Sequence, residues 1–242
     1  MRERKDLHCL HEPFMYDYYL NPRRPRTTRD MPHFSPETDH PHEYAGILDM
    51  ILKQAQSKPV FFKDMSYYLT PYLDSEANVE FSKQIKHCFL IRNPKATIAS
   101  YFAMDEGVTL EEIGIEAQWL HAESLKRTGI QPLVLQAEAV QNDPQGQIKN
   151  WWDALGLTAV DSALTWNSDT PQEWTQVQAW HQSTIANSAI RKRSSKDDQV
   201  EQQRFDDAVK KAPHLQGYLE HHAPFFRRMQ ALVAENPLSS SA

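Results

Sequence analysis

Glycine and cysteine are scarce in this 242-residue sequence, and both shortages narrow what the chain can be. Only seven glycines occur, and none belongs to a G-x-x-x-x-G-K-[ST] pattern, so no nucleotide-phosphate loop of that type is visible. The two cysteines, Cys9 and Cys88, lie far apart without metal-ligand spacing, each in an apolar run. We therefore expect reduced, buried thiols, as is typical of a cytoplasmic protein.

Long apolar runs and an excess of positive charge are missing too. No run of 18 apolar residues exists, so we expect no membrane span, and the charged N-terminus has no apolar segment of a secretory signal. Lys and Arg number 26 against 32 Asp and Glu, a net charge of -6. Because nucleic-acid binding needs a basic surface, we expect no such partner. The oligomeric state stays open.

Short apolar segments alternate with helical patterns along the chain. The strand candidates are residues 7–11, 60–62, 87–91 and 132–135. This alternation predicts one α/β domain over residues 1–237, with a mostly parallel sheet covered on both faces. Residues 87–91 are continuously apolar, which predicts a strand buried on both faces. The Ser-rich tail, residues 238–242, is expected to be disordered.

The strongest local pattern is a strand that leads into a helix at Arg92. Asn93 is a suitable N-cap, and Pro94 suits the first helical position. A helix N-terminus attracts anions, and Arg92 adds a charged fork for phosphate oxygens. Ser100 follows two turns into the helix, where its hydroxyl could bind the same anion. In the alternative, Arg92 pairs with a carboxylate and Ser100 only packs.

Two further segments carry local predictions. Thr109 and Glu112 form a capping-box pattern, which predicts a helix from Thr109 that Gly129 ends. Residues 21–43 are rich in Pro, Arg and His, which predicts a long loop and a candidate lid over a substrate. Its histidines match no metal-binding pattern, so we expect no metal site. The loop's charged and histidine residues are Arg23, Arg24, Arg26, Arg29, His33, His40 and His42.

The segment from Leu90 through Arg92 to Ser100 resembles the motif by which sulfotransferases hold the 3′-phosphate of 3′-phosphoadenosine 5′-phosphosulfate. Other segments resemble, in the same order, parts of a bacterial sulfotransferase-like subgroup: His11-Glu12-Pro13-Phe14, Phe62-Lys63-Asp64-Met65, Leu164-Thr165-Trp166 and Ala223-Pro224-Phe225-Phe226. The resemblance implies a three-layer parallel sheet of the P-loop NTPase and sulfotransferase type. It also implies sulfuryl transfer from that donor, as co-substrate, to a small hydroxyl or amino acceptor.

Two departures from the family pattern leave alternatives open. The family's first strand and phosphate-binding loop, which hold the 5′-phosphosulfate, are not visible. A Ser-Thr-Gly-Phe element is replaced by Asn187-Ser188-Ala189-Ile190. Either the natural N-terminus is missing, or the chain is a degenerate, non-catalytic nucleotide-binding remnant. The resemblance places the missing strand between those that end at Lys63 and Arg92.

The remaining site candidates follow from the resemblance. Sulfuryl transfer needs a group that takes the acceptor's proton, and Glu12, at the end of the first strand, is the candidate catalytic base. In the alternatives, Glu12 caps a turn or pairs with an arginine, or His11 takes the proton. Arg191 and Arg193 form a second basic cluster that the resemblance places over the nucleotide. The alternative for this cluster is a solvated run of charge.

Overall fold

The computed structural model describes residues 1–24, 30–167 and 169–235, which form two compact units. The first unit comprises Met1–Pro71 and Val160–Ile190, and the second comprises Tyr72–Ala159 and Arg191–Ala242. The expectation of a single domain over 1–237 stays a prediction. The tail at 238–242 and the loop arginines Arg26 and Arg29 lie outside the described residues.

The first unit is built on two parallel strands. Strand β1 pairs with β2 in a register that places His8 opposite Val60 and His11 opposite Lys63, so both strands end at the same edge. Helix α2 packs on β2, with Ile47 and Ile51 buried. The elements are η1 (Arg2–Arg4), β1 (His8–His11), α1 (Met15–Leu20), α2 (Tyr44–Ala55), β2 (Val60–Lys63), α3 (Ser66–Leu69), η2 (Thr70–Tyr72, which runs into the second unit), η4 (Asp161–Leu164), η5 (Gln172–His181) and α9 (Gln182–Ile185).

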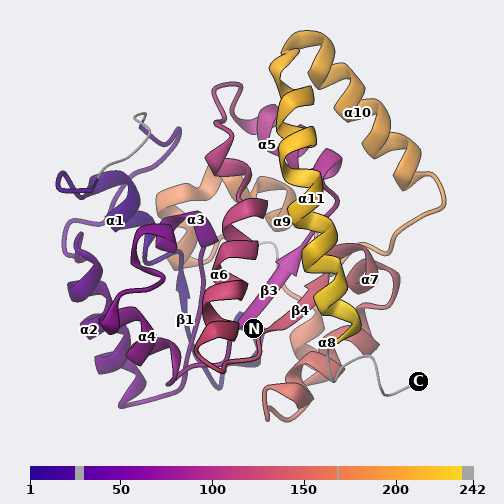
Figure 1. The fold of residues 1–242 in the computed structure, drawn as a ribbon. Coiled ribbons are helices and arrows are strands. Elements are labelled where there is room, and N and C mark those ends of the chain that lie inside the picture. The colour runs from indigo at the N-terminus through magenta and orange to yellow at the C-terminus, as the bar shows by residue number, and fades with distance from the viewer. Residues whose placement is uncertain (25–29, 168, 236–242) are drawn as a thin grey trace. The chain divides into compact units, whose positions relative to one another are not determined.

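The second unit has the same plan with longer helices. Strand β3 pairs in parallel with β4, Cys88 opposite Leu133 and Ile91 opposite Gln136. Helix α11 packs across both strands and against α5 and α6, while α10 packs on α5 (Figure 1). The elements are α4 (Glu76–Ser82), β3 (Cys88–Ile91), α5 (Pro94–Met104), η3 (Glu111–Ile113), α6 (Ile115–Arg127), β4 (Leu133–Gln136), α7 (Ala137–Asn142), α8 (Pro144–Ala154), α10 (Asp197–Lys211) and α11 (His214–Ala234).

The prediction of a mixed α/β fold with parallel strand pairing is confirmed. Within the described residues, however, the four strands form two separate two-stranded sheets rather than one continuous sheet. The expectation that residues 87–91 are buried on both faces is wrong at Leu90, which is 59% exposed. Its neighbours Phe89 and Ile91 point into the core under α11, and alternation along a strand turns Leu90 the other way.

Local sequence patterns predicted helix starts with mixed success. The side chain of Asn93 caps α5 by accepting a hydrogen bond from the Lys95 N–H at 3.0 Å, as expected. The capping box of Thr109 and Glu112 also forms. It closes only a 3₁₀ turn, however, and the helix expected from Thr109 begins at Ile115 instead. Gly114 adopts φ 77°, a left-handed conformation that interrupts the helix at little cost.

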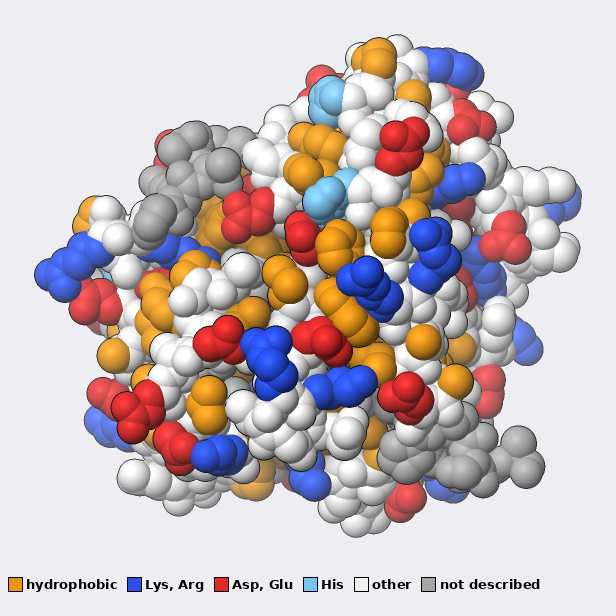
Figure 2. Space-filling view, in the orientation of Figure 1, with side chains coloured by type: hydrophobic (Ala, Val, Ile, Leu, Met, Phe, Trp, Pro, Cys, Tyr) orange, Lys and Arg blue, Asp and Glu red, His pale blue; other side chains and the backbone are white. Residues whose placement is uncertain are grey.

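The described part of the chain contains no helix long and apolar enough to cross a membrane. On the face drawn in Figure 2, the described acidic and basic side chains are interspersed, with hydrophobic side chains between them. Cys88 is half-buried in β3, and burial raises the pKa of its thiol to about 12. A thiol with such a pKa stays protonated at neutral pH, which fits a packing role.

Candidate functional site

The turn between β3 and α5 has the strand-to-helix geometry expected from the sequence. Strand β3 delivers Arg92 to its carboxyl end, and α5 begins two residues later with Pro94 at its first position. The Asn93 N–H donates to Glu138 Oε1 at 2.9 Å. The other oxygen of Glu138 is buried and has no hydrogen-bond partner among the described residues. A carboxylate therefore already lies at the start of α5.

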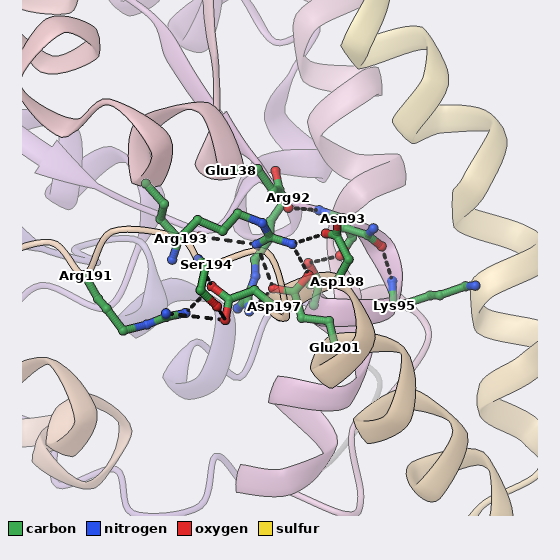
Figure 3. A network of polar contacts seen from close by, with 12 residues as sticks. Arg92, Asn93, Lys95, Glu138, Arg191, Arg193, Ser194, Asp197, Asp198 and Glu201 are labelled. Carbon is green, nitrogen blue, oxygen red and sulfur yellow. Dashed lines mark hydrogen bonds and ion pairs between the residues drawn. The ribbon is translucent and has the colours of Figure 1, made fainter.

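Arg92 and Arg193, 101 positions apart in the sequence (193 − 92), converge on one carboxylate (Figure 3). Glu201 Oε1 accepts from Arg193 Nη1 at 3.1 Å and lies 3.5 Å from Arg92 Nη2, while Glu201 Oε2 accepts from Arg193 Nη2 at 2.8 Å. Asp198 also accepts from Arg193 Nη2. We call Arg92, Arg193, Asp198 and Glu201 the arginine cluster.

The charges of the arginine cluster reinforce one another. The side chain of Arg193 is only 9% exposed, and its hydrogen bonds with Glu201 raise its pKa. The same hydrogen bonds lower the pKa of Glu201, so this carboxylate is ionised at neutral pH. The Arg92 side chain is 40% exposed, and its ion pair with Glu201 is long, at 3.5 Å. Of the two arginines of the cluster, Arg92 is therefore the more available to a ligand.

The other predicted ligands lie nearby in sequence but have different contacts. Arg191 donates to Asp197 Oδ2 at 2.8 Å, and Ser194 donates to the same carboxylate through its backbone N–H and its hydroxyl. The Ser194 N–H and then Arg191 lower the pKa of Asp197 to about 2. Ser100 is exposed on α5, and among the described residues no hydrogen bond joins it to the cluster.

The first unit contains a second polar cluster around Glu12. Because β1 and β2 are parallel and in register, Lys63, the last residue of β2, and Glu12, the residue after β1, lie at the same sheet edge. Lys63 Nζ donates to Glu12 Oε1, and the Tyr68 hydroxyl donates to Oε2 at 2.9 Å. Glu12 has φ 48°, an uncommon conformation for a residue other than glycine. The backbone strain at this point coincides with a buried, hydrogen-bonded carboxylate.

Two neighbouring carboxyl groups in this cluster have opposite protonation tendencies. Burial alone would raise the pKa of Glu12, but the charge of Lys63 brings it below its usual range. Burial, followed by the negative charge of Glu12, raises the pKa of Asp64 well above its usual range. Glu12 is thus the carboxyl group that ionises more readily, and Asp64 is the one that keeps its proton to higher pH.

His11 pairs with His181 beside Glu12. Their Nε2 atoms lie 2.9 Å apart, and Trp174 stacks on His181 with ring centroids 4.3 Å apart. Burial is the main cause that lowers the pKa of each imidazole to about 4. Both rings are therefore neutral at neutral pH, and one donates its Nε2 proton to the other. His11 Nε2 also lies 3.7 Å from Glu12 Oε1.

The sequence did not predict which side chains pair with the candidate site residues. Glu201 lies on α10, and only the fold brings this helix to Arg92. Lys63 could have been found, since parallel strands end at one edge and its strand follows that of Glu12. Tyr68 and His181 had no such signal, because each lies outside the strands.

The chain matches a protein-family model over most of its length. The family model described as a sulfotransferase domain matches residues 1–214 of the 242. No curated protein and no solved structure matches the chain significantly. The match therefore covers both polar clusters and most of the sequence.

Proposed function

We propose how this chain, which belongs to the sulfotransferase domain family, functions. It transfers a sulfuryl group from 3′-phosphoadenosine 5′-phosphosulfate to a small hydroxyl or amino acceptor. The observation that carries this proposal is the convergence of Arg92 and Arg193 on one anion. Two guanidinium groups around one oxyanion suit the 3′-phosphate of that donor.

The two ends of the donor fit the chain unequally. The arginine cluster and the start of α5 suit the 3′-phosphate, whereas the sequence shows no phosphate loop for the 5′-phosphosulfate. That second observation favours an alternative function, a nucleotide-binding protein that does not catalyse transfer. The main proposal includes a three-layer fold of the P-loop type. The parallel pairing of both strand pairs supports it, since that fold has a parallel sheet.

Glu12 is the proposed proton acceptor. As the acceptor oxygen or nitrogen forms a bond to sulfur, the bond between sulfur and the 5′-phosphate oxygen breaks, and adenosine 3′,5′-bisphosphate leaves. The acceptor's proton goes to the carboxylate of Glu12. Lys63 and Tyr68 orient this carboxylate, and each of its oxygens keeps a lone pair for the acceptor.

The nucleotide site is tested by calorimetric titration with adenosine 3′,5′-bisphosphate. Replacement Arg92→Ala should weaken binding by about 1.5–3 kcal/mol, the scale of a hydrogen bond to a charged group. The control is Arg127→Ala, which removes an exposed arginine of the same unit that pairs with Asp74. Equal affinity of wild type and Arg92→Ala would remove Arg92 from the site.

The catalytic role of Glu12 is tested by following the release of adenosine 3′,5′-bisphosphate from the donor with a panel of hydroxyl and amino acceptors. Glu12→Gln should lower kcat by about 10²–10⁴-fold with little change in donor affinity. The matched variant is His181→Gln, which disturbs the neighbouring imidazole pair and leaves Glu12 in place. Near-normal turnover by Glu12→Gln would assign the proton to another group, His11 first.

A further inference from the structure

Glu201 is placed where a ligand phosphate would lie. Both of its oxygens accept from the terminal nitrogens of Arg193, and one of them also faces Arg92. This two-pronged contact is the arrangement by which arginine binds a carboxylate or a phosphate. Figure 3 shows the acidic side chains at the start of α10 pointing toward the arginines. The two arginines that suit a phosphate thus already hold an anion from the chain itself.

The fold fixes Glu201 at this position. Helix α10 packs along α5, and the next residue, Gln202, accepts a hydrogen bond from Lys95 Nζ at 2.6 Å. The backbone N–H of Arg193 donates to the carbonyl of Gln141 at 3.2 Å, which ties the other side of the contact to α7. Glu201 therefore comes from a helix with a fixed register.

A phosphate and Glu201 cannot both occupy the arginines, because two anions in contact repel each other strongly. A phosphate monoester carries up to two negative charges and three acceptor oxygens, whereas a carboxylate has one charge and two oxygens. The phosphate is the stronger partner for two guanidinium groups, so it can displace Glu201. The contacts with Glu201 must be broken first, however, and their loss lowers the affinity for the phosphate.

We propose that Glu201 is a specificity-determining residue, which sets how much the 3′-phosphate of a nucleotide adds to its affinity. This inference rests on the proposed nucleotide site. Removal of the charge at Glu201 strengthens binding of nucleotides with a 3′-phosphate. It leaves nucleotides without that group unaffected, because only the 3′-phosphate competes with the carboxylate.

The test compares two ligands on two proteins by calorimetric titration. Adenosine 3′,5′-bisphosphate should bind Glu201→Gln about 10-fold more tightly than wild type, the lower end of the range for a charged hydrogen bond. Adenosine 5′-monophosphate should bind both proteins equally. The control variant Asp207→Asn removes an exposed negative charge from the same helix and should match wild type with both ligands.

A second variant keeps the test valid if Glu201→Gln folds poorly, which thermal melting would reveal. Asp198 is 86% exposed and also contacts Arg193, so Asp198→Asn removes a competing charge without disturbing the core. It should tighten binding of the bisphosphate by about 3-fold, since an exposed ion pair is worth less than a buried one.

Each remaining outcome is decisive. If Arg92→Ala weakens binding but Glu201→Gln and Asp198→Asn do not strengthen it, the site stands and the role of Glu201 is refuted. If both nucleotides bind Glu201→Gln more tightly by the same factor, the effect is general electrostatics and the inference fails. If neither wild type nor Glu201→Gln binds the bisphosphate, the proposed nucleotide site fails together with the inference.

Discussion

His121 should make the folded chain sensitive to acid, since it is a buried histidine. Only 7% of this residue is exposed, and neither ring nitrogen has a partner among the described residues. Its ring lies against Phe89 and against His87, at centroid distances of 5.3 and 5.6 Å. Burial, followed by the repulsion of His87, lowers the pKa of His121 from 6.5 to about 3.

The lowered pKa fixes the sign and size of the effect. Between pH 6.5 and 3 the unfolded chain binds a proton at His121 that the folded chain does not, so stability falls as the pH drops through this window. Each pH unit below 6.5 costs about 1.4 kcal/mol. Between about pH 7.5 and about pH 5, His121 should therefore remove about 2 kcal/mol from the free energy of unfolding.

The assay is urea unfolding of wild type and His121→Leu at both pH values. Packing changes caused by the substitution are the same at both, so they cancel when the two differences in unfolding free energy are subtracted. The remainder should be about 2 kcal/mol in favour of the variant at about pH 5. Leu125→Ala, a core change on the same helix, should be equally destabilising at both pH values. Equal pH dependence of wild type and His121→Leu would refute the reasoning.

Two further predictions concern the strand and helix that carry Arg92. Leu90→Thr, at an exposed position of β3, should change the free energy of unfolding by less than about 0.5 kcal/mol. Ile91→Thr, at the fully buried neighbouring position, should lower it by about 2–4 kcal/mol. Urea titrations measure both changes. Similar costs for both would show that Leu90 is covered. Asn93→Ala should lower the free energy of unfolding by about 1 kcal/mol through loss of the helix cap, and Asn93→Ser should retain most of the cap. Thermal melting of each variant tests this, and equal melting temperatures of Asn93→Ala and wild type would show that the cap adds no stability.

The turn at Arg92 could be predicted from the sequence because every signal for it is local. An apolar strand, an N-cap and a proline lie within seven residues, and each acts through its own backbone neighbours. The wrong prediction that a helix starts at Thr109 also has a local cause. Its capping box forms, but the left-handed conformation of Gly114 outweighs it and moves the helix start to Ile115. A glycine within five residues of a capping box is a warning that periodicity alone does not give.

The partners of the candidate residues could not be predicted, because they depend on tertiary packing. The sequence predicted Arg92 and Arg193 as phosphate ligands and left open that Arg92 pairs with a carboxylate. The structure supplies that carboxylate from Glu201, which lies 109 positions after Arg92 and on a different helix. No local pattern encodes such a contact, since it follows from how α10 packs on α5.

The net charge of -6 also gave no sign of the arginine cluster, where we propose that an anion binds. A nearly buried guanidinium such as that of Arg193 is costly unless an opposite charge meets it, and Glu201 and Asp198 provide that charge. The acidic residues that stabilise the arginines also lower the overall charge, so the net charge does not reveal the proposed phosphate site. Under the proposed function, the carboxylate that stabilises the folded cluster is also the one that a phosphate ligand would displace. The proposal therefore implies that the Glu201 carboxylate raises the stability of the fold and lowers the affinity for the phosphate.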